Sequence, residues 1–306
     1  MAVYAIKRVA SALVTLFAVA TLTFFLMYLV PGGPFLAEKA PSPQTLKALE
    51  QKYGLDQPVI VQYGNYMKRL FLKLDLGTSL KMRGQEINDI IRTRFPTSAK
   101  IGAIAVLVAV CVGIPLGSVA ALKRGRLLDR IIMFLATLGI AVPGFVVATV
   151  LMFTFGVKLH LLPTYGLTTP LHYILPVMAL SFYPTAYISR LMRSSMLDVL
   201  GQDYMRTARA KGISQFKSLF KHALRNAVLP IVTYLGPMLA YILTGSFVVE
   251  KIFTIPGLGN QFISSITDRD YPLIMGTTIF LAFLLITMNV VVDIAYKIID
   301  PRIKLK

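Results

Sequence analysis

The residues of this chain that could catalyse a reaction or bind a metal are few and scattered. Its three histidines are His160, His172 and His222. The first two lie near the extracytoplasmic membrane face predicted below and the third near the cytoplasmic face, so we expect them not to share a metal ion. The sequence contains no HExxH or CxxC metal motif and no GxxxxGK(S/T) phosphate loop. An intramembrane serine protease needs a histidine at the depth of its serine, and the last apolar run has none. The sequence therefore predicts a chain that is not an enzyme, with no catalytic residue, no metal site and no cofactor of its own.

The remaining reactive or charged candidates have plain structural interpretations. Cys111 lies between two valines in an apolar run and is predicted to be a small buried residue. Ionisable groups inside membrane segments are often functional, and here only Asp293 and Lys100 qualify, each near the end of an apolar run. Asp293 could pair with a basic residue at the interface or anchor its helix end. So few buried carboxylates argue against a carrier driven by protons or sodium ions.

The composition predicts a membrane protein. The chain is 56% apolar and 15% charged with a net charge of +18, whereas soluble domains are about 45–50% apolar and about 25% charged. This excludes a disordered chain, and a single cysteine excludes an internal disulfide framework. Six apolar runs are long enough to be candidate membrane helices, which need about 20 residues: 9–30, 98–122, 131–157, 173–188, 229–249 and 273–296. The first run exceeds the 7–15 residues or so of a signal peptide core, so we expect a retained helix.

The basic residues predict the orientation. The N-terminus, 123–130, 189–228 and 297–306 carry 18 of the 32 basic residues, and the two short loops of opposite parity carry only 3. Because positive charge marks the cytoplasmic side, both termini are expected inside. We predict an all-α polytopic protein with six transmembrane helices: 1–30 form the N-terminus and first helix, 31–97 a small extracytoplasmic helical segment, and 98–306 a five-helix core with a cytoplasmic loop at 189–228.

The extracytoplasmic segment has clear helix signals. Ser42, followed by a proline, is a typical N-cap, and Gly54 is a typical stop. Pro58 opens a second helix. A third helix is predicted over 85–94, ending before Pro96.

Small residues and prolines in the apolar runs predict close packing and bends. Gly113 and Gly117 are four residues apart, a spacing that lets helices approach closely. Prolines can bend helices and release carbonyl groups. The residues expected to pack helices or act as hinges are Gly113, Gly117, Pro143, Pro176 and Pro237, although ordinary membrane packing would also account for each one.

The most informative stretch is 203–212, with the sequence DYMRTARAKG. Asp203 can cap a short helix that Gly212 ends in the left-handed conformation. The basic residues lie toward its C-terminal end, where the helix dipole favours cations. Ser214 can cap a following helix. Such a short helix could enter a groove in a partner protein or lie on anionic lipid.

DYMRTARAKG followed by HALRNAVLP at 222–230 resembles the cytoplasmic-loop signature of ABC-importer permeases, in the form found in peptide transporters. Nine further stretches agree in the same order along the chain: VPGGP (30–34), YGLDQPVIVQY (53–63), DLGTS (75–79), RFPTSAKIGA (94–103), GIPLG (113–117), VPGFV (142–146), EKIFTIPGLGNQF (250–262), RDYPLIMG (269–276) and IDPRI (299–303). The resemblance covers essentially the whole chain and is greatest to B-type permease subunits of oligopeptide or dipeptide importers.

This resemblance implies the partners and the site. Such permeases pair with a C-type permease in the bacterial plasma membrane, receive peptide from an extracytoplasmic binding protein, and work with two ATPase subunits that bind ATP and Mg. The ATPase coupling helix maps to Asp203, Tyr204, Arg206, Thr207, Ala208, Arg209, Lys211 and Gly212. The general family pattern begins Glu-Ala-Ala where this chain has Arg206-Thr207-Ala208, so no contact of the usual glutamate transfers to this chain.

The resemblance also implies alternating access driven by ATP hydrolysis in the partners. The segment 250–272 would face outside, and its Pro256, Gly257, Leu258 and Gly259 would form an outer gate, dock the binding protein, or simply pack as a re-entrant loop. The alternative function is an autonomous channel or ion-coupled carrier. The substrate remains open among dipeptides, longer peptides, glutathione-like compounds and metal chelates.

Overall fold

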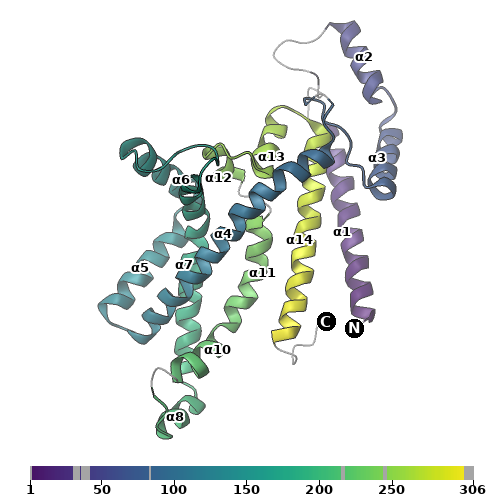
Figure 1. Ribbon diagram of the computed structural model, residues 1–306. Coiled ribbons are helices and arrows are strands. Elements are labelled where there is room, and N and C mark those ends of the chain that lie inside the picture. Colours follow the sequence, from purple (N-terminus) through teal and green to yellow (C-terminus); the bar gives the residue numbers. More distant parts are fainter. Residues whose placement is uncertain are drawn as a thin grey trace. The chain divides into compact units, whose positions relative to one another are not determined.

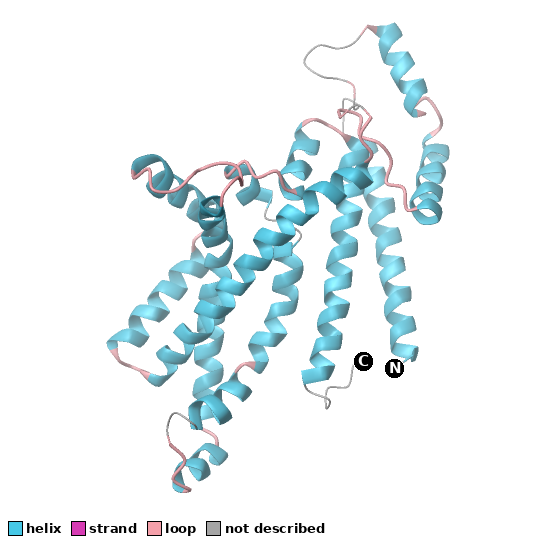
Figure 2. Ribbon diagram, viewed as in Figure 1, coloured by secondary structure: helices cyan, strands magenta, loops and turns pink. Residues whose placement is uncertain are grey.

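The computed structural model describes residues 2–29, 35, 42–82, 84–214, 218–243 and 247–299. Within these residues the chain is helical, apart from turns and one isolated bridge between Thr78 and Glu86 (Figure 2). The α-helices are α1 (Ala2–Leu29), α2 (Pro43–Tyr53), α3 (Val59–Lys73), α4 (Ile87–Leu122), α5 (Leu127–Ala141), α6 (Gly144–Leu151), α7 (Ile174–Leu200), α8 (Asp203–Ala210), α10 (Leu224–Ala227), α11 (Leu229–Leu243), α12 (Phe247–Ile252), α13 (Leu258–Thr267) and α14 (Tyr271–Ile299) (Figure 1). The π-helical turns η1 (Met152–Lys158) and η3 (Ser218–Ala223) and the 3-10 turn η2 (Pro170–Tyr173) complete the set.

The contacts divide the chain into two compact units. Among the described residues, one comprises 2–97 with 256–287, and the other 98–255 with 288–299. The boundary after Thr97 coincides with the predicted end of the extracytoplasmic segment, but the first unit also recruits α13 and most of α14.

In the first unit, α1 packs against α3 through an aromatic core. Phe24 of α1 is 5% exposed and stacks on Tyr66 of α3, with the ring centroids 5.8 Å apart. The hydroxyls of Thr21 and Tyr63 also hydrogen-bond at 2.9 Å. The pairing buries Ala20 and Phe24 of α1 against Tyr66 and Leu70 of α3, while most large apolar side chains of α1 stay exposed.

The helix signals of the extracytoplasmic segment are largely confirmed. The Ser42 hydroxyl accepts a hydrogen bond from the Thr45 N–H at 3.3 Å, and Gly54 ends α2 with φ +67°. Helix α3 follows Pro58 as predicted.

The helix expected over 85–94 is present from Ile87, but its predicted end before Pro96 was wrong. Helix α4 begins at Ile87 and continues through Pro96 to Leu122. Proline removes one hydrogen bond within a helix, here that to the carbonyl of Arg92, but both residues are exposed and polar surroundings can satisfy this carbonyl. The proline therefore fails to end the helix.

Asp270 links two distant stretches of the first unit. Its side chain is buried, with 1% of the residue exposed, and accepts hydrogen bonds from the Ser79 hydroxyl and from the Leu80 N–H at 3.1 Å. The Ser79 hydroxyl oxygen in turn accepts the Met82 N–H at 2.8 Å. Nearby, Gly276 leaves room for Ile87, whose Cγ2 would lie only 2.6 Å from an added Cβ. These contacts fix the turn around residues 75–82 to the start of α14.

The second unit is built around α7, which packs against α4, α5 and α11 (Figure 1). A Cβ on Gly117 of α4 would lie 2.4 Å from the Ser189 carbonyl oxygen, and one on Gly113 would lie 2.8 Å from Ile188 Cγ2. A Cβ on Gly139 of α5 would lie 2.6 Å from the Ala186 Cβ. The three glycines therefore permit backbone approaches that no other residue would allow.

A sharp bend separates α5 from α6. The axes of Leu127–Ala141 and Gly144–Lys158 differ by 105° at a break next to Pro143. Proline has no N–H to donate, which allows the helix to be interrupted there.

By length and composition, three described helices could cross a membrane: Arg8–Leu29, Ile87–Leu122 and Tyr271–Val291. The bent pair around Pro143 would be a fourth. The predicted runs 173–188 and 229–249 fall outside this group. Serines, prolines and Arg190 dilute the apolar content of α7, and the described part of α11 ends at Leu243. The count of six spans and the cytoplasmic termini therefore stay predictions.

The prediction for Cys111 was wrong. Its thiol is free and exposed on α4, because α4 turns its glycine face toward α7 and leaves Cys111 outside that contact.

Candidate functional site

The predicted coupling segment forms the short helix α8 and a left-handed stop. Gly212 has φ +73°, as expected of a glycine that ends a helix. Asp203 is the first residue of α8, so the predicted N-cap position belongs instead to Gln202. Asp203 contributes through its carbonyl, which accepts the Thr207 hydroxyl at 3.0 Å. Its ion pair with Arg206 spans 3.7 Å with both side chains largely in solvent, so it adds little stability.

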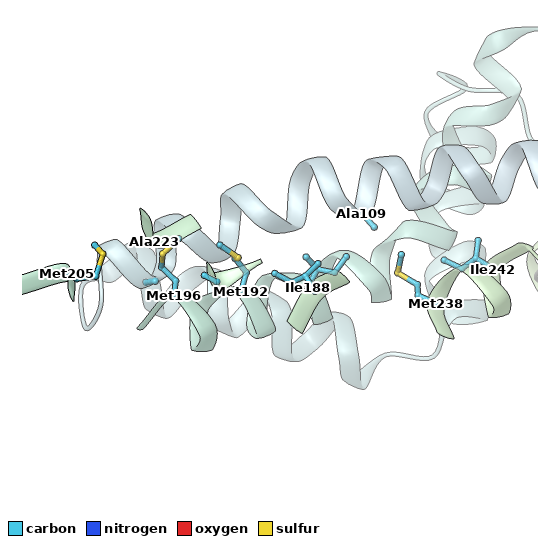
Figure 3. Packing of buried hydrophobic residues seen from close by; sticks show 11 residues of the cluster. Ala109, Ile188, Met192, Met196, Met205, Ala223, Met238 and Ile242 are labelled. Atoms are coloured by element: carbon cyan, nitrogen blue, oxygen red, sulfur yellow. The ribbon is translucent and has the colours of Figure 1, made fainter. Parts of the chain in front are cut away.

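Met205 anchors α8 to the rest of the second unit. Its side chain is 1% exposed and belongs to one continuous apolar cluster (Figure 3). The buried members of this cluster are Ala109, Ala121, Ile188, Met192, Met196, Met205, Ala223, Ala227, Ile231, Met238 and Ile242. They come from α4, α7, α8, η3, α10 and α11. The cluster therefore connects α8 directly to the long helices of its unit.

A polar contact fixes the rotation of α8 about this anchor. The Asn226 side-chain amide donates a hydrogen bond to the Tyr204 hydroxyl at 2.9 Å. Asn226 lies on α10, which follows the π-helical turn η3. Of the helix predicted after Ser214, the structure describes the π-helical turn from Ser218 and then α10, and residues 215–217 lie outside the described residues.

The opposite side of α8 is exposed and polar. The exposed residues of α8 are Asp203, Tyr204, Arg206, Thr207 and Ala210, and the turn after it exposes Lys211 and Gly212. For Ala208 and Arg209 the structure describes the helical backbone but not the side chains. A short helix that binds a partner needs a buried apolar side chain to hold it in place and an exposed polar face for the partner to contact. Helix α8 has both, in Met205 and in its exposed polar residues.

An ion pair with a buried carboxylate joins the first turn of α5 to α7. Asp129 is 3% exposed and binds Arg193 through two hydrogen bonds, Nε to Oδ1 at 2.5 Å and Nη2 to Oδ2 at 2.8 Å. The Gly125 N–H donates a third hydrogen bond to Oδ2 at 2.8 Å. A bidentate pair of this kind holds two elements in one orientation. We call Asp129, Arg193 and Gly125 the inner clamp.

The decisive evidence on family comes from comparison with known proteins. Residues 113–305 match the family described as binding-protein-dependent transport system inner membrane component, and residues 1–102 match the N-terminal region of such membrane components. The chain belongs to this family.

Two relatives in this family match over nearly their full lengths. The chain is 50% identical over 305 residues to the dipeptide transport system permease protein DppB of Bacillus subtilis, covering 100% of this chain and 99% of the relative. It is 44% identical over 300 residues to the oligopeptide transport system permease protein OppB of Haemophilus influenzae, covering 97% and 98%.

Solved structures of other transporters share the fold of this family member. An inward-facing structure of the MetNI methionine ABC transporter matches with a TM-score of 0.56 at 15% identity, covering 69% of this chain and 97% of that one. A structure of an amino acid ABC transporter with histidines matches with a TM-score of 0.52 at 17% identity, covering 71% and 95%.

Most of the four residues of the segment 250–272 that were candidates for an outer gate or a docking loop are buried in this family member. Pro256 is exposed, whereas Gly257, Leu258 and Gly259 are buried. Gly257 precedes α13, and the other two begin it. Burial of three of the four residues favours the packing interpretation over a docking surface.

The predicted hinges and charged residues occupy varied environments. Pro176 is buried in the first turn of α7, and Pro237 is exposed within α11. Lys100 lies over the Tyr173 ring, with Nζ 4.8 Å from its centroid, a favourable cation–π contact. Asp293 lies on α14, but its side chain is outside the described residues.

Among the described side chains, His160 and His172 have no partners for a metal site, and the side chain of His222 lies outside that description. His160 and His172 both border a hollow beside residues 161–165. The Nδ1 atom of His172 lies 2.8 Å from the Thr169 hydroxyl oxygen. Among the described residues, no three His, Cys, Asp or Glu side chains gather as a metal would require.

Sequence reasoning missed Met205 and the inner clamp. Both left a signal. Met192 and Met196 are one helical turn apart, and Met205 is the only large apolar aliphatic residue of α8. Asp129 is the sole acidic residue within 123–130, a stretch with four basic residues, and an isolated carboxylate there suggests a specific ion pair.

Proposed function

We propose that this chain is the transmembrane permease subunit of an ATP-driven peptide importer in a bacterial plasma membrane. The proposed mechanism depends on one observation. Met205 attaches the polar, exposed helix α8 to the same apolar cluster that contains residues of α7 and α11. Six transmembrane helices with both termini in the cytoplasm would place α8 on the cytoplasmic side, where 189–228 carries eight basic residues.

In this mechanism the chain forms half of the translocation pathway and a C-type permease forms the other half. Two ATPase subunits, which hold ATP and Mg, receive the coupling helix of each permease in a groove. An extracytoplasmic binding protein delivers the peptide. When the ATPases approach one another, the displacement of α8 passes through the apolar cluster to α7 and α11. The outward-open and inward-open states must differ in affinity for ATP and for peptide, because coupling requires such a difference.

The substrate class follows the names of the relatives, which are dipeptide and oligopeptide transport permeases. Short peptides are therefore the proposed cargo.

The test uses the complete transporter in proteoliposomes, with its binding protein and ATPase subunits. Gly212→Asp, or charge reversal of both Arg206 and Arg209, is expected to lower peptide uptake at least tenfold while ATP hydrolysis persists. The reason is that Gly212 has φ +73°, which an aspartate adopts only with strain, and that both arginines lie on α8. The matched control is Lys158→Glu, which reverses an exposed charge far along the chain from α8 and should leave uptake unchanged.

Normal uptake by both coupling variants would contradict the role of α8. Peptide transport by this chain alone, without ATPase subunits, would contradict the proposed function itself and indicate a channel or carrier.

A further inference from the structure

Three tyrosines form a continuous aromatic track across α7 and α11. The rings of Tyr183 and Tyr187 stack with centroids 6.2 Å apart, and those of Tyr187 and Tyr234 lie 4.2 Å apart. Tyr183 and Tyr187 are one helical turn apart on α7, and Tyr234 comes from α11. The track therefore joins the two helices that the apolar cluster connects to α8.

The polar ends of these rings are unsatisfied. Tyr183 is 44% exposed, and Tyr187 and Tyr234 are half-buried. None of the three hydroxyls has a hydrogen-bond partner among the described residues. Leaving a hydroxyl without a partner in an apolar medium is costly, and tyrosines that face lipid usually lie at the membrane interfaces.

Tyr183 lies well inside the predicted span 173–188, whereas Tyr187 lies near its predicted cytoplasmic end. Tyr183 is nine residues beyond Ile174, the first residue of α7. At about 1.5 Å per residue this places it roughly 13 Å along a hydrocarbon core of about 30 Å. The Tyr183 hydroxyl is therefore better explained by contact with a polar occupant than by contact with lipid, and Tyr187 continues this surface toward the predicted cytoplasmic end of α7.

A positive charge continues the same face. Arg190 is exposed and lies three residues after Tyr187 and seven after Tyr183, which puts all three on one side of α7. A guanidinium binds a carboxylate with two parallel hydrogen bonds. The face thus offers aromatic surface, phenolic donors and acceptors, and then one cationic group.

We propose that Tyr183, Tyr187, Tyr234 and Arg190 form a binding track for a peptide in transit. This proposal rests on the proposed function. The phenols hydrogen-bond the peptide backbone, the rings pack against side chains of any kind, and Arg190 binds the terminal carboxylate. Recognition through groups that all peptides share gives a track that tolerates different side chains.

The first experiment identifies the occupant directly. A photoreactive benzoylphenylalanine replaces Tyr183 in the complete transporter, which is illuminated during uptake of radiolabelled trialanine. The matched control places the same residue at Phe182, which is 42% exposed and contacts the α5 side near Gly139. Peptide adducts at position 183 and not at 182 support the track. Adducts only with the second permease subunit or lipid, or no peptide adduct while uptake continues, overturn it.

The second experiment removes one group at a time. Tyr183→Phe and Tyr187→Phe keep the rings and should each lower uptake efficiency about fivefold, as expected for one lost hydrogen bond. Arg190→Gln should lower the uptake of free-acid trialanine more than that of its C-terminal amide, and Arg190→Lys should restore part of the difference. Each variant is compared with the unmodified chain for the same peptide, so any preference of the binding protein cancels. Equal losses for both peptides would overturn the role of Arg190.

The proposed function and the binding track predict different results in these experiments. If the proposed function is wrong, the unmodified transporter shows no ATP-dependent peptide uptake. If only the track is wrong, uptake is normal and insensitive to these four side chains.

Discussion

Breaking the inner clamp should destabilise the protein asymmetrically, depending on which partner is removed. Arg193→Met leaves the Asp129 carboxylate buried, with its side chain 5% exposed and only the Gly125 N–H as a partner. Removing one member of a buried ion pair costs about 3–5 kcal/mol. Because the Arg193 side chain is 28% exposed and water can enter its place, we expect the lower end of that range.

Asp129→Asn should cost less than Arg193→Met. The amide oxygen can still accept from Arg193 or from Gly125, and the arginine can reach water. One weakened charge-assisted hydrogen bond corresponds to about 1.5 kcal/mol. The double variant contains neither buried charge, so adding Asp129→Asn should partly rescue Arg193→Met.

The assay is the thermal unfolding midpoint of the chain in lipid nanodiscs, measured as a double-mutant cycle. At about 2 °C per kcal/mol, Arg193→Met should lower the midpoint by roughly 6 °C, and the double variant should recover part of this loss. The control cycle uses Asp203 and Arg206, an ion pair at 3.7 Å whose side chains are 96% and 78% exposed, and should show no measurable coupling. Additive losses in the Asp129 and Arg193 cycle would refute the reasoning.

Three further predictions follow from single positions. Gly117→Ala should lower the unfolding midpoint by an amount equivalent to about 1–3 kcal/mol, because its Cβ would lie 2.4 Å from a carbonyl oxygen, whereas Gly64→Ala in open space on α3 should be neutral or stabilising. Met205→Ala should destabilise by about 2–5 kcal/mol and reduce uptake more than ATP hydrolysis, since the side chain is 1% exposed; an equal loss of both activities would count against its coupling role. In a cysteine-free background, cysteines at the exposed positions Lys211 and Leu161 should react only with reagents applied to the cytoplasmic and the extracytoplasmic side, respectively, and the reverse pattern would invert the predicted topology.

Local signals predicted the helix ends well where one residue decides the backbone geometry. Helix α2 begins after Ser42 and ends at Gly54 as expected, and Gly212 adopts the left-handed conformation. A cap depends on a hydrogen bond between near neighbours, and a positive φ depends on the absence of a Cβ, so both can be read from sequence.

Signals that depend on surroundings were less reliable. Pro96 does not end a helix, because an exposed carbonyl can be satisfied without the missing N–H. Cys111 is exposed because the apolar run that contains it presents its glycines, and not its whole circumference, to α7. An apolar run specifies a membrane helix but not which side of that helix faces protein.

The segment from Asp203 to Gly212 could be singled out by its sequence pattern, but the residues that support it in the structure could not. The spacing from Asp203 to Gly212 is contiguous and could be recognised directly. Met205 acts through Met196 and Ala223, and Asp129 acts through Arg193, 64 residues away. Contacts over such separations depend on how α5, α7 and α10 pack, which one sequence does not specify.

The two kinds of contact around α7 differ in how easily they can rearrange. The contacts with α4 and α5 pass through Gly117 and Gly139, where an added Cβ would lie 2.4 Å from the Ser189 carbonyl oxygen and 2.6 Å from the Ala186 Cβ, respectively. Sliding at such a contact would create clashes or voids, so these three helices should move together. The contact with α8 and α11 is instead rich in methionine, through Met196, Met205 and Met238. Methionine has three rotatable bonds and refills irregular gaps at small cost. If α8 is displaced as proposed, we expect these methionine contacts to repack before the glycine contacts of α7 with α4 and α5 change.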